Sequence, residues 1–452
     1  YLSENEQKIK YVKATIYREG KNNKKLLEEF TKMEKSRTFS EYDENDEEQK
    51  WTTFTYDLNK SNFGKQSAIL GIESFRKNIC KVLLFCSDIN SIQLNGEEPI
   101  SDESSIKQQQ NIDGNYCKII EKNFKYENSK FIIISSEEIN KEYSKRYAKM
   151  HDLDQVDDKK FKVRIAIQVD ENKQIKKQTH KDTCLFCTFP LIGSENYQLP
   201  YFVDCPHFDT MTERNGIYLD GEEYDSKNVL TNTGLNHLIL NRSIDLFEIG
   251  IDWLIRNGYS KFSSFSNGLI NNSATMNLFT DKIRSILKNS EIIHDSTKKP
   301  EKLANIVFLD FSNIEKREVF HELTSSRNEK IASFDECIEW EDSIFKDLSI
   351  LTIDVFITDV IKFLKNVDRE SLSKQHLPFL NQLYSFLINE PSCDKYFSQN
   401  IVLSANCELK SLNELKSISN LPDDLNKIMS FCEPWKNKII HPVFLYSAYL
   451  EG

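Results

Sequence analysis

The stretch Phe161-Lys-Val-Arg-Ile-Ala-Ile-Gln-Val169 alternates large apolar side chains with polar or small ones. Successive side chains of a β-strand point to opposite faces, so the alternation predicts a strand with one face in a core and one face toward water. Strand-like segments rich in β-branched and aromatic residues lie on both sides of it: 51–58, 89–94, 115–121, 130–135 and 184–190. We therefore predict a mixed sheet with covering helices over residues 51–220.

The hydrophobic period changes after Asn232, from the two-residue repeat of strands to the repeat of amphipathic helices. Helices are predicted at 67–85, 235–257, 274–287, 315–324, 337–347, 353–366 and 378–388, and a short strand at 400–403. The predicted fold class is α+β. The predicted domains are a charged segment (1–50) continuing from a missing upstream domain, an α/β domain (51–230), a mainly helical domain (231–370) and a small mixed α/β element (371–452).

The net charge and the cysteine spacing of the chain indicate which kinds of partner and which cellular compartment to expect. The chain has 452 residues and a net charge of −11, so it repels phosphate backbones unless its basic residues cluster, and nucleic acid is not the partner we expect first. Its ten cysteines are irregularly spaced, which argues against a disulfide framework. The sequence shows no signal peptide and no apolar run near twenty residues, so we predict a cytoplasmic protein with reduced thiols and no membrane contact.

One cysteine pattern has the ligand count of a zinc site. Cys184 and Cys187 form C-x-x-C, and Cys205 and His207 follow about eighteen residues later. Zinc takes four such ligands in a tetrahedron. However, the apolar stretch 184–190 alternates as a strand, which would place Cys184 and Cys187 on opposite faces. Buried structural thiols are therefore the favoured interpretation, and a zinc-binding module is the alternative.

An arginine stands at the end of a polar loop. The apolar strand that begins at Phe202 leads into the segment 210–216, in which Arg214 precedes an Asn215-Gly216 turn. A fixed guanidinium can stabilise phosphoryl charge on a neighbouring domain, as an arginine finger does. From the pattern alone, a surface arginine is the competing interpretation. The chain has no G-x-x-x-x-G-K-[ST], G-x-G-x-x-G or G-x-S-x-G motif of its own.

The phrases 185–194, 199–203 and 212–219 resemble large bacterial GHKL ATPases related to sacsin, in the region behind the ATPase domain. Looser similarity extends in order over most of residues 51–445. The chain departs from the family at Ser404-Ala405-Asn406, which replaces Pro-Asn-Gln, and at Glu408, where glycine is usual. The acidic-Asn helix and D-x-G-x-G loops of a GHKL nucleotide pocket are not present in this sequence.

The resemblance implies a GHKL second-domain-like βαβ sheet sandwich followed by a mostly helical region. It implies a coupling role in an ATP-dependent, chaperone-like protein, with ATP and Mg bound by an N-terminal ATPase domain outside this chain. By analogy with the ninety-kilodalton heat-shock chaperone, Arg214 would contact the γ-phosphate, with Glu213 and Asn215 shaping its loop. This chain alone would then be inactive. Expected partners are the ATPase domain, a protein client and a second copy in a homodimer. The alternative function is a scaffold in a bacterial defence or nucleic-acid-processing ATPase.

Overall fold

The computed structural model describes residues 10–13, 23–41, 62–86, 88–94, 96–112, 115–179, 182–266, 273–312, 314–341, 348–417 and 422–444. The chain divides into two compact units, Tyr1–Lys77 and Asn78–Gly452. The first contains helix α1 (Asn23–Ser36), an antiparallel pair of β1 (Lys10–Lys13) with β2 (Thr38–Glu41), and the first turns of α2 (Asn62–Phe85). The strand predicted at 51–58 lies outside the described residues.

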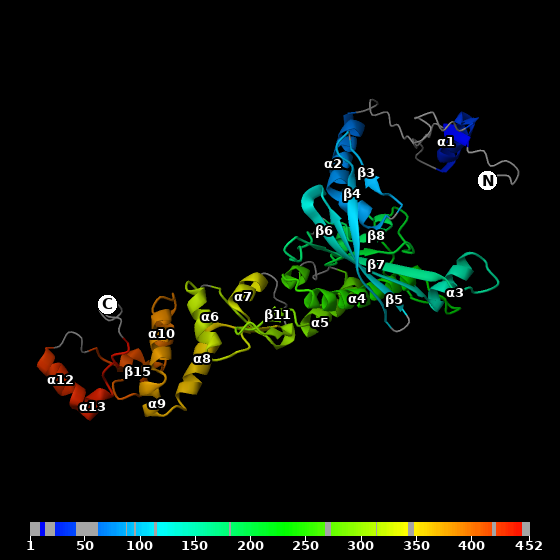
Figure 1. Cartoon of the computed structure of the whole chain (residues 1–452). Coiled ribbons are helices and arrows are strands. Elements are labelled where there is room, and N and C mark those ends of the chain that lie inside the picture. The colour runs from blue at the N-terminus through cyan, green and yellow to red at the C-terminus, as the bar shows by residue number, and fades with distance from the viewer. Residues whose placement is uncertain are drawn as a thin grey trace. The chain divides into compact units, whose positions relative to one another are not determined.

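The second unit is built on one curled, mixed sheet (Figure 1). The strand order is β3-β4-β5-β6-β7-β10-β8-β9, and β10–β8 is its parallel pair. The strands are β3 (Ser91–Ile92), β4 (Ile100–Ile112), β5 (Asn115–Phe124), β6 (Ser129–Ile139), β7 (Lys160–Val169), β8 (Leu185–Cys187), β9 (Phe189–Pro190) and β10 (Phe202–Asp204). Helix α3 (Lys141–Met150) connects β6 to β7. The prediction of a mixed sheet with helices in an α+β fold is confirmed.

Both faces of this sheet are covered. On β6, Ile132 and Ile134 contribute to one buried cluster while Phe131 and Ile133 contribute to another, as the two-residue period of a strand requires. The last turns of α2 pack on the second face, and helix α4 (Asn232–Arg256) packs on the first. The prediction of a water-facing side on β7 is therefore wrong at Ala166, which is fully buried in the cluster that contains the end of α2.

Two sheet elements differ from the prediction. Strand β4 is missing from the prediction because its sequence, ISDESSIKQQQNI, is too polar to give an apolar alternation. It pairs with β5 along its length and with β3 only at its first residues, so it lies close to the sheet edge. The segment predicted as one strand at 184–190 forms two strands, because Thr188 takes a left-handed φ of 66° and reverses the chain between β8 and β9.

Helices are found at the predicted segments 274–287, 315–324, 353–366 and 378–388. Residues 342–347 of the helix predicted at 337–347 lie outside the described residues, and the short helices at 369–374, 393–397, 423–431 and 433–436 have no predicted counterpart. The helices after α4 are α5 (Ala274–Asn289), α6 (Arg317–Ser325), α7 (Phe334–Trp340), α8 (Ile353–Leu364), α9 (Arg369–Lys374), α10 (Leu377–Leu387), α11 (Cys393–Phe397), α12 (Asp423–Phe431) and α13 (Glu433–Lys436). Three small sheets accompany them: β11 (Ile293–His294) with β12 (Pro300–Glu301), β13 (Val307–Leu309) with β14 (Ser349–Leu351), and β15 (Val402–Leu403) with β16 (Leu409–Lys410). Among the described helices, none is both long and apolar enough to cross a membrane.

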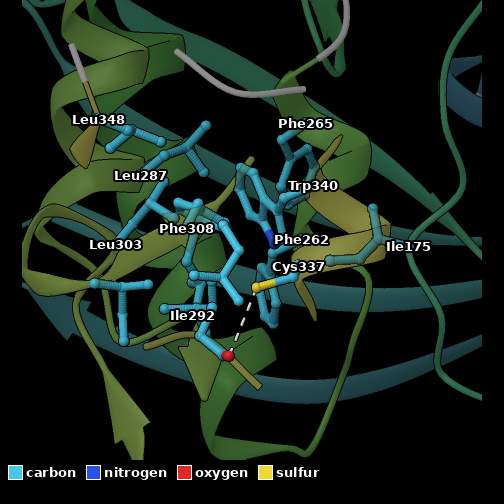
Figure 2. Close-up of a cluster of buried hydrophobic side chains, with 14 of the residues drawn as sticks. Ile175, Phe262, Phe265, Leu287, Ile292, Leu303, Phe308, Cys337, Trp340 and Leu348 are labelled. Carbon is cyan, nitrogen blue, oxygen red and sulfur yellow. Dashed lines mark hydrogen bonds between the residues drawn. The ribbon is translucent and has the colours of Figure 1, made fainter. Parts of the chain in front are cut away.

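One buried cluster continues from the sheet into this region. Figure 2 shows Ile175, which follows β7, near Phe262 and Phe265 of the 3-10 helix η4 (Phe262–Ser266), with Phe308 and Trp340 in the same cluster. The rings of Phe308 and Trp340 lie 6.1 Å apart between centroids. The predicted boundary at 230 falls immediately before α4, which supplies one wall of the sheet core.

Candidate functional site

Arg214 lies at the tip of a tight hairpin. Thr210 and Ile217 form an antiparallel bridge, the Met211 amide donates to the Gly216 carbonyl (2.9 Å), and the Arg214 amide donates to the Met211 carbonyl (2.8 Å). Arg214 has a φ of 55°, a left-handed conformation that is uncommon outside glycine, and it is exposed. We call residues 209–218 the arginine loop.

A second loop supports the first from one side. Gly193 has a φ of 110°, and a Cβ there would lie 2.5 Å from the carbonyl oxygen of Asn215, so only glycine fits. Tyr197, at the end of the 3-10 helix η3 (Ser194–Tyr197), places its hydroxyl between the two backbone groups of Ile217. The Ile217 amide donates to Tyr197 Oη at 3.0 Å, and Oη donates to the Ile217 carbonyl at 3.3 Å. This loop therefore holds the outgoing strand of the hairpin.

The first turn of α4 supports the arginine loop from the other side. Thr231 caps α4 by accepting from the Gly234 amide, which fixes where the helix begins. Asn236 is fully buried and makes three bonds of 2.9 Å: Oδ1 accepts from the Asp209 amide, and Nδ2 donates to the carbonyls of Asp209 and Tyr218. One amide side chain thus joins the two ends of the arginine loop.

The charged residues of the arginine loop differ in their partners: Asp209 forms an ion pair with Arg146, whereas Arg214 is exposed. Arg146 on α3 is buried and donates to the Leu230 carbonyl (2.6 Å), to Asn232 Oδ1 (2.9 Å) and to the carboxylate of Asp209. Burial raises the pKa of Asp209, while the Arg146 guanidinium acts in the opposite direction. Asp209 is therefore paired inside the protein, and the guanidinium of Arg214 stands on the exposed tip of the same loop.

Glu213 and Asn215 flank Arg214 on the tip, and both are exposed. Burial raises the pKa of the Cys187 thiol. The nearby charge of Arg214 acts in the opposite direction, with a smaller effect. Three apolar residues are also exposed: Met211 in the arginine loop, Ile192 next to Gly193, and Phe189 on β9. The tip therefore offers one guanidinium, whose N–H fork matches phosphate or carboxylate oxygens, beside exposed apolar side chains.

The zinc candidates Cys184, Cys187 and His207 are hydrogen-bonded to other groups of the protein, and Cys205 is fully buried. Cys184 is buried, donates to the Ser194 carbonyl (2.8 Å), and burial raises its pKa to about 12. Cys187 donates to the Pro206 carbonyl (3.5 Å), and burial raises the pKa of fully buried Cys205 as well. The His207 ring bonds the Tyr143 hydroxyl through Nδ1 (2.8 Å), and burial lowers its pKa. Within the described ranges, no three His, Cys, Asp or Glu side chains are grouped so that they could hold a metal ion.

The sequence pattern placed Arg214 on a loop before a turn, as the structure does, but it did not indicate the residues that hold this loop. Ser194 is fully buried and accepts from the Leu185 amide at 3.0 Å, a role that a serine next to a glycine does not reveal in the sequence. Asn236 lies in a predicted helix, where an asparagine carries no local signal of a tertiary bond. Comparison of this chain with protein-family models, with curated proteins and with solved structures found no match.

Proposed function

We propose that this chain is the coupling region of a GHKL-type, ATP-dependent, chaperone-like protein of the sacsin-related kind. In this proposal Arg214 contacts the γ-phosphate of ATP held with Mg by an ATPase domain outside this chain, and Glu213 and Asn215 shape the approach. The observation that carries the proposal is an exposed arginine on a loop held at both ends, by Tyr197 on one side and by Asn236 on the other.

The rest of the chain fits this role. We assign the curled sheet, covered by the end of α2 on one face and by α4 on the other, as the second-domain-like βαβ sandwich of GHKL proteins. The exposed apolar residues Met211, in the same loop as Arg214, and Ile192, next to Gly193, suit a domain that docks and releases. The buried cysteines Cys117, Cys184, Cys205 and Cys337 are thiols, which suits the reducing cytoplasm. A protein client and a homodimeric second copy remain partners in this proposal.

The test is Arg214→Ala in the protein that carries the ATPase domain. Removing a preorganised cation that acts on developing phosphoryl charge should lower the turnover of ATP on the order of 10²-fold. The Kd for ATP should change little, since the pocket belongs to the other domain. Steady-state hydrolysis and equilibrium nucleotide binding measure the two quantities.

Arg256→Ala is the matched control, because Arg256 is an exposed arginine on the last turn of α4, paired with Asp252 at 3.5 Å and remote from the arginine loop in sequence. It should keep normal turnover. A normal rate for Arg214→Ala removes Arg214 from the mechanism. Hydrolysis by this 452-residue chain alone, lost on Arg214→Ala, would instead make it a self-contained enzyme and contradict the coupling role.

A further inference from the structure

We infer that Asn236 is the positioning residue of the arginine loop and that it links the reach of Arg214 to helices α4 and α5. The inference rests on the proposed function for its catalytic consequence, but its structural part stands on the hydrogen bonds of the loop itself. Asn236 is the side chain whose three bonds bridge Asp209, at the start of the loop, and Tyr218, at its end.

The geometry makes Asn236 hard to replace. Its oxygen must accept from one amide while its nitrogen donates to two carbonyls, a set that an asparagine or glutamine amide can supply and a carboxylate cannot. The side chain is fully buried, so water cannot substitute for a lost bond without entering the core. Loss of Asn236 should therefore release the two ends of the loop while leaving the helix that carries it in place.

The neighbouring residue extends the link to α5. His237 Nε2 lies 2.9 Å from the Leu219 carbonyl, directly after the loop, and the His237 ring lies 5.3 Å from that of Phe279 on α5. At the start of α5, Thr275 Oγ1 donates to the carboxylate of Asp220 at 2.8 Å. A shift of α4 or α5 relative to the loop must therefore break or carry these bonds.

Helix α4 is long enough to connect the arginine loop with distant parts of the fold. Its 25 residues span roughly 37 Å at the rise of an α-helix. It packs against β6 and β7 and against α5. The first turn of α4 thus connects the residue that meets the nucleotide, in the proposed function, with the helical region that follows the sheet. The position of Arg214 is therefore tied to this helix through Asn236.

The first arm of the experiment uses this chain and needs no nucleotide. Hydrogen–deuterium exchange at the Met211 and Arg214 amides, which both donate within the hairpin, is measured in Asn236→Ala and in the isosteric Asn236→Asp. Both variants should raise exchange at these amides about tenfold or more, while amides in the middle of α4 stay protected. Asn241→Ala, which removes another α4 asparagine bonded to Lys282, should leave the loop unchanged.

Should the Asn236 variants fail to fold, Tyr197→Phe keeps the ring and removes the two bonds to Ile217, and it should release the same loop. Unchanged exchange at Met211 and Arg214 in a folded Asn236 variant overturns the inference, because the loop is then held without the amide.

The second arm measures turnover in the protein with its ATPase domain. A misplacement of Arg214 should lower kcat about tenfold to a hundredfold with KM little changed. Adding Asn236→Ala to Arg214→Ala should have no further effect, since the amide acts through the arginine. Independent, multiplying effects would show that Asn236 acts elsewhere and would end the positioning role. Two outcomes separate the proposals. If Arg214→Ala has normal turnover and Asn236→Ala has raised exchange in the arginine loop, only the proposed function is refuted. If Arg214→Ala has reduced turnover and Asn236→Ala has unchanged exchange in the loop, only this inference is refuted.

Discussion

Several residues around the arginine loop share a backbone conformation that L-amino acids rarely adopt. Thr188, Gln198 and Arg214 have φ angles of 66°, 50° and 55°, and Gly193 has a φ of 110°. Such conformations are unfavourable by about 1 kcal/mol or more each and persist where the surrounding structure fixes them. Two side chains hold this backbone in place. The Asp204 carboxylate accepts from the Thr188 amide at 2.9 Å, and the Tyr197 hydroxyl accepts from the Ile217 amide at 3.0 Å. Three left-handed non-glycine residues therefore lie on or next to the candidate site.

Gly193→Ala tests this packing. The new Cβ would meet the Asn215 carbonyl at 2.5 Å in a backbone conformation that alanine avoids, so the free energy of unfolding should fall by about 2 to 4 kcal/mol. Gly258→Ala is the control, because Gly258 has a φ of 71° but open space around it, and it should lose only about 1 kcal/mol. Urea denaturation measures both. Equal losses would mean that the contact with Asn215 is not tight.

His441 gives a pH dependence whose sign follows from its surroundings. Burial lowers its pKa below the ordinary 6.5, and its Nδ1 accepts from the Val443 amide at 3.1 Å, which requires the neutral ring. As the pH falls through 6.5, the unfolded state binds the proton first, so stability present above that pH is lost on acidification. The slope from this group is at most about 1.4 kcal/mol per pH unit.

The variant His441→Asn should remove this contribution while keeping an acceptor for the Val443 amide. Its unfolding free energy should therefore fall less than that of the unchanged chain between pH 7.5 and pH 5.5. An unchanged slope in His441→Asn would show that the group does not titrate differently on folding.

At the scale of elements, the sequence predicted those whose apolar residues repeat with a clear period. Helix α8 begins after the Thr352 cap and buries one face, including Phe356, Ile357 and Val360, as its spacing indicates. Strand β4 could not be recognised, because its polar residues lie near an edge where the core imposes no alternation. The division of residues 184–190 into two strands depends on Thr188, a residue that does not signal a turn.

At the candidate site, too, some residues carry a local sequence signal and others do not. Arg214 was recognisable because a charged residue before Asn-Gly marks an exposed turn. Its supports were not, because Tyr197 and Asn236 act through bonds to backbone groups 18 to 27 residues away in sequence. Tertiary bonds between a side chain and a distant backbone leave no local pattern. The exposed position of Arg214 on a turn can thus be predicted, whereas the residues that hold its loop in place require the structure.

At the scale of the molecule, the buried cluster in Figure 2 ties the sheet to the helices that follow it within Asn78–Gly452. Trp340 is among its largest fully buried side chains and contacts Phe308, while Ile175 joins the cluster from the end of β7. In the proposed coupling role, this cluster transmits movement between the sheet and the helical region that follows it. The sheet and the helical region should therefore unfold together.

Trp340→Ala should therefore do more than lower stability. Removing a buried tryptophan leaves a cavity and is unfavourable by about 3 to 5 kcal/mol. Because the cavity lies where the sheet and the helical region meet, we expect the unchanged chain to melt in one transition and Trp340→Ala to melt in two, with the sheet melting apart from the helices. Trp435→Ala, at a side chain that is half exposed, should keep one transition at nearly the same Tm. Calorimetry compares the two variants. One transition at a lower Tm for Trp340→Ala would show that other contacts suffice to join the regions, and that the cluster stabilises the fold without being its mechanical link.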